Sequence, residues 1–237
     1  MKDVKDVNDP IKICYLCGKD LKGEISRDHV PPRQFYSTNI RRQNSPNLFT
    51  IPVHKSCNKA YQKDEDYFVH SIAPLAQESY SGSEVWKDIT HQFQSPEGLR
   101  IGKMILKEFD GRPSGLYLPG GKVVKRFDAE RVWRVVWKIV RGLFFKEHQR
   151  FLPEDTLITY YKVISVGEKP PPEFDVVRDT PSRGQYPGVF DYKYIVEPKL
   201  DNFNLWAMLF WDRLIKMIGF HDPECQCDSC LNMKEED

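Results

Sequence analysis

The sequence predicts an α+β fold in which a loop-rich N-terminal module precedes a domain with an antiparallel sheet and one main helix. Three observations lead to this prediction. The segment 11–70 is loop-rich and locally basic, a helical repeat of apolar residues follows Asp128, and several later segments are rich in β-branched and aromatic residues. We therefore divide the chain into an N-terminal tail (1–10), a module (11–75), an α+β domain (76–220) and a Cys-rich tail (221–237).

Composition limits the classes of protein to consider. The 237 residues are 40% hydrophobic and 13% aromatic, which supplies a core and excludes a disordered chain. No apolar run approaches the roughly 18 residues of a membrane span, and the charged segment Met1 to Pro10 lacks the apolar stretch of a signal peptide. We expect a soluble, cytoplasmic protein.

Charge is unevenly distributed along the chain. The totals of 35 Lys plus Arg and 34 Asp plus Glu give a net charge of only +1, which argues against a polybasic binder. Between Lys12 and Lys63, however, ten basic residues face three acidic ones. This segment suggests a phosphate-rich partner, and an ordinary solvated surface is the alternative.

The first element of the module is a pair of cysteines, Cys14 and Cys17, followed by Gly18. Two thiolates at this spacing can bind one ion through a tight turn, and glycine permits the unusual backbone that the turn needs. His54 and Cys57 repeat the spacing and complete a set of three sulfurs and one imidazole. Because this set fills all four positions of tetrahedral zinc, we expect a structural zinc site.

A second constellation lies between and beside these pairs. Asp28 and His29 are adjacent, Asn47 precedes the second pair, and Asn58 directly follows Cys57. Asp28 and the amide oxygen of Asn58 are oxygen ligands of the kind that Mg²⁺ prefers. On an extended strand His29 would face the other way from Asp28 and could act as a general base on water. We expect Asp28, His29 and Asn58 to line one cleft.

The middle of the chain is predicted from local signals. Residues 71–96 carry weak helix signals, whereas 99–109 and 116–127 resemble strands joined around 111–115. Asp128 can cap the main helix, whose apolar residues recur at helical spacing: Val132, Val135, Val136, Ile139, Val140 and Leu143. We expect the basic residues of this helix, Arg131, Arg134, Lys138 and Arg141, to face water rather than DNA.

The later segments predict the sheet. Residues 157–166 and 189–196 resemble strands, and the Pro-rich segment 168–184 between them resembles a loop. Residues 205–211 and 214–220 flank Asp212 and Arg213, which could form a hairpin turn. A single helix over the same residues is the alternative, because apolar runs this short fit either period.

The C-terminal tail holds a second group of possible metal ligands: His221, Cys225, Cys227 and Cys230. These could bind a second structural zinc ion. Their spacing is irregular and their flanks are typical of a chain end, so free thiols on a mobile tail are the alternative.

The order of these motifs in residues 11–70 resembles that of the HNH endonucleases, which have a ββα-metal fold. The closest form is the HNN variant, in which asparagine follows the last zinc cysteine, as Asn58 does here. The resemblance implies that Asp28 and Asn58 bind a catalytic Mg²⁺ or Mn²⁺ ion, that His29 is the general base and that Asn47 steadies the loop carrying it. His54 replaces the more usual third cysteine, a change that zinc accepts.

The function implied by the resemblance is metal-dependent hydrolysis of phosphodiester bonds in DNA, in a setting such as restriction or phage defence, with RNA as a further possible substrate. Arg27, Arg33 and Lys59 could bind flanking phosphates. Glu65 could support the metal, or belong to a charged helix surface. The alternative function is a catalytically inactive, zinc-stabilised nucleic-acid-binding protein.

Overall fold

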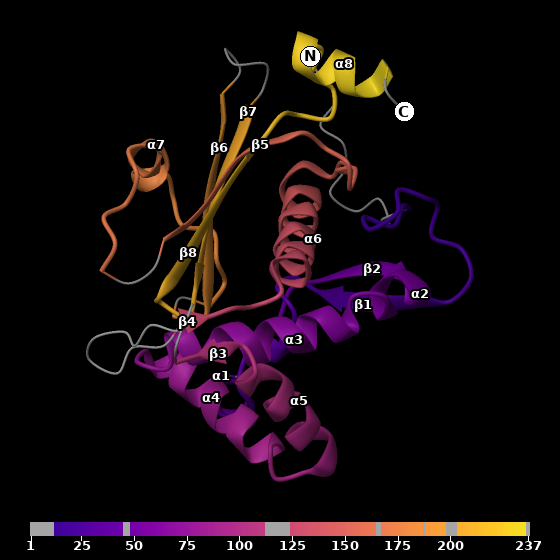
Figure 1. Cartoon of the computed structure of the whole chain (residues 1–237). Helices are drawn as coiled ribbons and strands as arrows, with labels where there is room; N and C mark the ends of the chain where they lie inside the picture. The colour runs from indigo at the N-terminus through magenta and orange to yellow at the C-terminus, as the bar shows by residue number, and fades with distance from the viewer. Residues whose placement is uncertain are drawn as a thin grey trace.

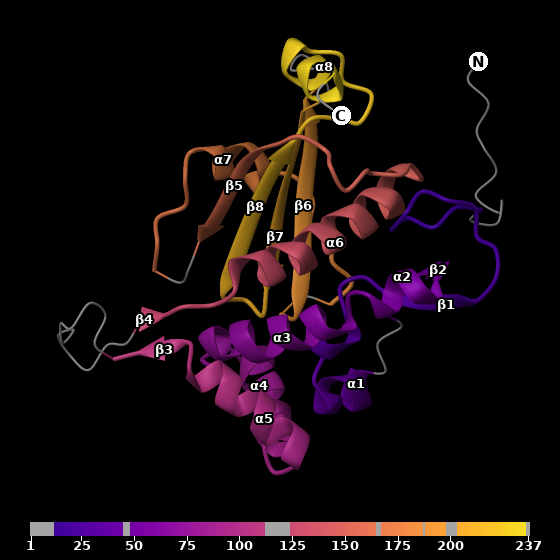
Figure 2. The ribbon, with the colours of Figure 1, turned by 45° about the vertical axis from the view of Figure 1, so that its right-hand side comes forward.

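The computed structural model describes residues 12–44, 48–111, 124–164, 167–186, 188–197 and 203–235. It shows an α+β fold, as predicted. A four-stranded antiparallel sheet lies on one side of the long helix α6 (Ala129–His148), and the N-terminal elements lie on the other side (Figures 1 and 2). No helix in these ranges is both long and apolar enough to cross a membrane.

The N-terminal elements begin with two paired strands. β1 (Ile25–His29) runs antiparallel to β2 (Thr50–His54), with Asp28 opposite Ile51 and His29 opposite Thr50. Between them lie a 3-10 turn, η1 (Arg33–Phe35), and α1 (Thr38–Asn44). α2 (Lys55–Lys59) follows β2 directly, and α3 (Gln62–Ile72) comes next. Asn47 lies outside the described residues.

Three helical elements connect this part to the main helix. They are η2 (Ala73–Ala76), α4 (Tyr80–Gln92) and α5 (Pro96–Leu106). The strand expected over 99–109 is therefore wrong for most of its length. The side chain of Ser95 accepts a hydrogen bond from the backbone N–H of Gly98, and Pro96 occupies the first helical turn, so this is a well-capped helix start.

A short pair of strands follows α5. β3 (Phe109–Asp110) pairs antiparallel with β4 (Val124–Lys125). The strand expected over 116–127 is thus described only at its end, because residues 112–123 lie outside the described ranges.

The main helix begins as predicted. The Asp128 side chain accepts a hydrogen bond of 3.2 Å from the backbone N–H of Arg131, and the helix ends at Gln149 in the left-handed conformation. The expectation that its basic side faces water is wrong for Lys138 and Arg141, each of which is only 1% exposed. These two side chains point at the N-terminal elements, which offer them carboxylates and backbone carbonyls.

The sheet has the strand order β5 (Ile158–Ile164), β8 (Leu214–Phe220), β7 (Phe203–Phe210) and β6 (Phe190–Glu197). The hairpin alternative for 205–220 is confirmed, and the single helix is wrong. Trp211 and Asp212 adopt positive φ angles of 50° and 53° in the turn between β7 and β8. A short helix, α7 (Glu173–Arg178), lies within the expected loop 168–184, and α8 (Asp228–Glu235) is the last described element.

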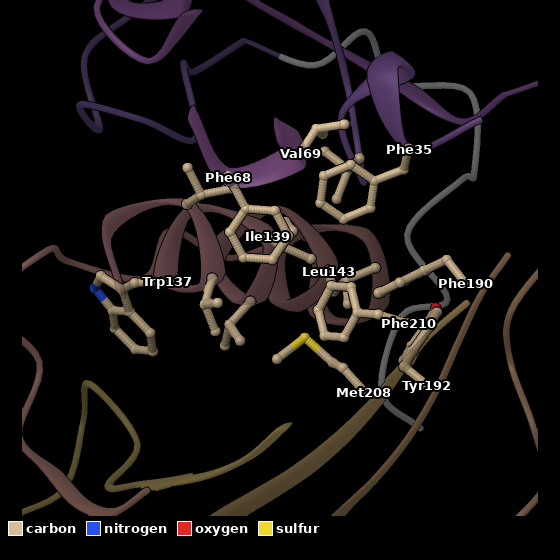
Figure 3. Close-up of a cluster of buried hydrophobic side chains, with 14 of the residues drawn as sticks. Phe35, Phe68, Val69, Trp137, Ile139, Leu143, Phe190, Tyr192, Met208 and Phe210 are labelled. Atoms are coloured by element: carbon tan, nitrogen blue, oxygen red, sulfur yellow. The ribbon is translucent and has the colours of Figure 1, made fainter. Parts of the chain in front are cut away.

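One hydrophobic core joins the two halves of the chain. Ile139 and Leu143 of α6 lie between Phe68 of α3 and Met208 of the sheet (Figure 3). Because this core crosses the expected boundary near residue 75, neither half buries its apolar residues alone. The domain boundaries drawn from the sequence stay a prediction.

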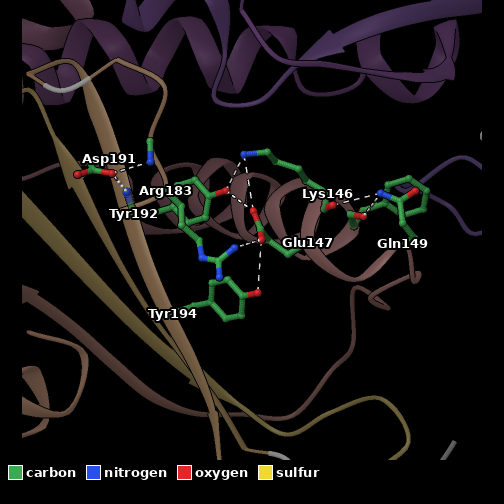
Figure 4. Close-up of polar contacts among 9 residues, drawn as sticks. Lys146, Glu147, Gln149, Arg183, Asp191, Tyr192 and Tyr194 are labelled. Atoms are coloured by element: carbon green, nitrogen blue, oxygen red, sulfur yellow. Dashed lines mark hydrogen bonds and ion pairs between the residues drawn. The ribbon is translucent and has the colours of Figure 1, made fainter. Parts of the chain in front are cut away.

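A polar cluster fixes the C-terminal end of α6 to β6 (Figure 4). Glu147 accepts hydrogen bonds of 2.6 Å from both the Tyr192 hydroxyl and the Arg183 guanidinium. The Lys146 ammonium donates to the same Tyr192 oxygen at 2.8 Å. α6 is therefore oriented by polar contacts with the sheet as well as by the apolar core.

Candidate metal centres and the adjoining cleft

The structure brings the four N-terminal metal-ligand candidates together. One ligand atom each from Cys14, Cys17, His54 and Cys57 lies within 4.8 Å of the others. The turn that carries the first pair is closed by a 2.8 Å hydrogen bond from the N–H of Gly18 to the carbonyl of Cys14. Gly18 has a φ of +71°, and a Cβ atom there would lie 2.9 Å from the Phe151 ring. The sequence-based role of Gly18 is thus confirmed.

The imidazole of His54 is oriented for metal binding. Its Nε2 lies 3.0 Å from the backbone carbonyl of Asp20, a contact in which the ring N–H donates. Nδ1 then remains unprotonated, 3.4 Å from Cys17 Sγ and 4.0 Å from Cys57 Sγ. The backbone N–H of Lys22 approaches Nε2 at 3.5 Å, but the shorter contact decides the tautomer.

The close approach of the three sulfurs affects the acidity of the Cys57 thiol. Burial and the neighbouring thiols of Cys17 and Cys14 raise the pKa of Cys57 to about 12. A cation bound by all three sulfurs would reverse this shift, because it favours the thiolate. Three sulfurs and one imidazole suit tetrahedral zinc, so this cluster could hold a metal ion such as zinc.

The C-terminal candidates also converge. Nδ1 of His221 lies 3.4 Å from the sulfurs of both Cys225 and Cys227, and Cys230 completes the group. The adjacent Asp222 is buried and forms a two-pronged ion pair with Arg150, at 2.8 and 3.1 Å. This second cluster could likewise hold a metal ion such as zinc.

A cleft of about 370 Å³ lies beside the N-terminal cluster. Its lining includes Asp28, His29 and Asn58, as expected, and two of the predicted phosphate-binding residues, Arg33 and Lys59. The further lining residues are Ser26, Pro32, Gln34, Lys55, Gln62 and Glu65.

Arg27, the third predicted phosphate-binding residue, does not line the cleft. It is exposed, and its guanidinium donates to Thr50 Oγ1 on β2 at 2.8 Å. This contact holds the exposed Arg27 side chain against β2 rather than in the cleft.

His29 is half-buried at the edge of the cleft. Burial lowers its pKa from 6.5; Arg33, Lys138 and Arg27 lower it further, while Asp28 acts in the opposite direction. The ring is therefore neutral at pH 7, and a neutral imidazole can accept a proton.

Asp28 is buried within a network of hydrogen bonds. Its Oδ1 lies 2.7 Å from the ammonium of Lys138, and its Oδ2 accepts a hydrogen bond from the hydroxyl of Tyr15. The same ammonium forms an ion pair with Glu65. Burial alone would lower the pKa of Lys138, but the Asp28 and Glu65 carboxylates reverse the effect and raise it. Lys138 is therefore charged.

Asn58 is held by a neighbour on β1. Its Nδ2 donates to Ser26 Oγ at 3.2 Å, which leaves the amide oxygen as an acceptor within the cleft lining.

Contacts from α6 reach the metal-ligand turn itself. The guanidinium of Arg141 donates to the carbonyl of Leu16 at 2.8 Å and to that of Leu152 at 2.9 Å. Tyr15 and Leu16 are the two residues between the ligands Cys14 and Cys17. The turn is thus tied to Asp28 through Tyr15 and to α6 through Leu16.

No family model matches this chain, and no match was found among curated proteins or solved structures.

Sequence reasoning missed two residues of this region, Tyr15 and Lys138, and left the role of a third, Glu65, open. Tyr15 and Lys138 gave no local signal, because their partner Asp28 lies 13 and 110 residues away. Glu65 was considered only as a possible support for a metal, and the alternative of a charged helix surface is wrong because Glu65 is 7% exposed.

Proposed function

We propose that this protein is a metal-dependent endonuclease of the HNH type that hydrolyses phosphodiester bonds in DNA. The observation that carries the proposal is the shared cleft of Asp28, His29 and Asn58 beside a Cys₃His cluster. The local order of two antiparallel strands followed by helices also fits a ββα arrangement.

The donor set of the cleft suits a hard divalent cation. Asp28, Asn58 and Glu65 offer carboxylate and amide oxygens, the ligands that Mg²⁺ and Mn²⁺ prefer. Such an ion would supply stabilisation of the charge that develops on the scissile phosphate. The Cys₃His cluster has a different role in the proposal, because its four ligands leave zinc no open position for substrate.

The chain's own residues then have distinct tasks. His29 accepts a proton from the attacking water, for which its lowered pKa keeps it neutral at pH 7. Arg33, Lys55 and Lys59 line the cleft with positive charge and bind flanking phosphates. Because these contacts are confined to one cleft, the near-zero net charge of the chain is compatible with DNA binding.

The test is nicking of a supercoiled plasmid in Mg²⁺ or Mn²⁺. We expect the wild-type protein to nick DNA and His29→Ala to be slower by at least about 100-fold, the usual contribution of a general base. His91→Ala, which alters an exposed histidine outside the cleft lining, serves as the matched control and should nick normally. If the wild-type protein binds DNA but cuts neither DNA nor RNA with either metal, the proposal fails in favour of an inactive nucleic-acid-binding protein.

A further inference from the structure

A lysine from the C-terminal half of the chain lies behind the cleft. Lys138, near the middle of α6, is 1% exposed and does not itself line the cleft. Its ammonium lies 2.7 Å from Oδ1 of Asp28 and also bonds Oε1 of Glu65. One buried cation therefore contacts two carboxylates that come from β1 and α3.

This arrangement determines how the carboxylates face the cleft. Asp28 and Glu65 both line it, whereas the ammonium contacts them from the core side. Two buried carboxylates at one site would repel each other, and an ammonium between them removes that repulsion. Burial raises the pKa of Glu65, and the Lys138 ammonium acts in the opposite direction. With both carboxylates ionised, the two acids and one ammonium sum to −1, which attracts a cation from the open side.

We propose that Glu65 joins Asp28 as an acidic oxygen donor for a hard divalent cation in the cleft, and that Lys138 is a positioning residue that holds both carboxylates toward it. This inference rests on the proposed function, because it concerns the metal of the same cleft. It makes α6 part of the site, so that the N-terminal module is incomplete without the helix.

The neighbouring ion pair on α6 provides a matched control. Arg134, one turn before Lys138, donates to Oδ2 of Asp64 at 2.5 Å, and Arg131 donates to Oδ1 at 2.7 Å. Asp64 is 9% exposed, against 7% for Glu65, and is adjacent to it in sequence, but it does not line the cleft. Asp64→Asn and Arg134→Met therefore disturb the same helix contact without altering the proposed donors.

The experiment measures Mn²⁺ binding to the zinc-loaded full chain by titration, followed by the electron paramagnetic resonance of free Mn²⁺. We expect Glu65→Gln to weaken Mn²⁺ binding at least about tenfold, while Asp64→Asn binds like the wild type. Zinc content, measured on the same samples, should be unchanged in both variants.

Lys138→Met tests whether the ammonium positions the two carboxylates for the metal or competes with the metal for them. If Lys138 positions the carboxylates, its loss weakens Mn²⁺ binding at least about tenfold, Lys138→Arg restores part of the affinity, and Arg134→Met changes little. If the ammonium merely competes with the metal, Lys138→Met tightens binding, which would overturn the inference. If Lys138→Met does not fold, the Mn²⁺ affinities of Glu65→Gln and Lys138→Arg test the inference instead. Wild-type Mn²⁺ affinity in both variants would overturn it.

These outcomes separate the inference from the proposed function. Mn²⁺ binding that depends on Glu65, in a protein that does not nick DNA, supports the inference and refutes the nuclease. Nicking that depends on His29, with Mn²⁺ affinity unaffected by Glu65→Gln, supports the nuclease and refutes the inference. A wild-type protein that binds no Mn²⁺ refutes the inference outright.

Discussion

The two Cys/His clusters offer the same kinds of ligand in different settings. In the first, Cys17 and His54 are 37 residues apart, so a bound ion would join distant segments. In the second, all four ligands lie within the short segment 221–230. The same set of three sulfurs and one imidazole could thus join distant segments in one cluster and stabilise one short segment in the other.

The surroundings of the clusters differ as well. Tyr15, between two ligands of the first cluster, donates to Asp28 in the cleft, and the adjacent Leu16 accepts from Arg141 of α6. None of the ligands of the second cluster lines that cleft. The role of a Cys/His cluster therefore depends on which neighbouring residues its ligands hold in place.

The sharpest test of this comparison removes one sulfur from each cluster. Cys17→Ser should lower the free energy of unfolding by at least about 3 kcal/mol, because the first cluster joins the turn at Cys14 and Cys17 to the end of β2 and to α2. Cys227→Ser should leave the main unfolding transition within about 1 kcal/mol of the wild type, since its cluster joins only residues of one short segment, which can open locally. Chemical denaturation of both variants measures the difference. Equal losses would contradict the contrast between the clusters.

The turn of the first cluster allows a finer test. Gly18→Ala should cost roughly 2 kcal/mol, because φ is +71° and the added Cβ would meet Phe151 at 2.9 Å. Gly23→Ala is the control: its φ is +80° but nothing lies within 4 Å, so only the backbone penalty of roughly 1 kcal/mol applies. Urea unfolding of zinc-loaded samples measures both costs. Equal costs would show that the contact with Phe151 is unimportant.

Removal of one positive charge from the cleft should have a smaller effect than the changes above, and it should appear in DNA affinity. Arg33→Gln should weaken binding and reduce the slope of log affinity against log salt by about 1, because one phosphate contact is lost. Arg27→Gln, outside the cleft lining, should change that slope little. Fluorescence anisotropy over a range of salt concentrations gives both slopes. A larger change for Arg27→Gln than for Arg33→Gln would contradict DNA binding in the cleft.

The smallest expected effect concerns how the rate of DNA nicking depends on pH. His29 must be neutral to accept a proton, so nicking should fall as pH decreases through its pKa. Because burial lowers that pKa from 6.5, the midpoint should lie below pH 6.5. His221→Ala, in the second cluster, should leave the midpoint unchanged. A midpoint above pH 6.5 in the nicking rate would contradict the assignment of His29.

The features predicted from the sequence rest on short-range spacing. The two ligand pairs, the Asp128 cap of the main helix and the Asp212 turn each depend on neighbours a few residues away. The strand expected over 99–109 failed although its signal was equally local, because Ser95 and Pro96 form a helix start that outweighs the apolar run that follows.

The remaining features depend on contacts between distant segments. Lys138 lies 110 residues from Asp28 and 73 from Glu65, so no spacing in the sequence relates them. The basic residues of α6 are predicted to face water, because an amphipathic pattern shows only that one side of a helix is polar. Whether that side meets water or carboxylates is decided by tertiary packing.

We propose that the first cluster supports a cleft for a hard divalent cation and that the second does not. Anomalous diffraction from crystals grown with zinc and manganese, recorded at both absorption edges, tests it directly. We predict zinc in both Cys/His clusters and manganese only between Asp28, Glu65 and Asn58. Manganese absent from the cleft, or bound beside His221 instead, would contradict the account.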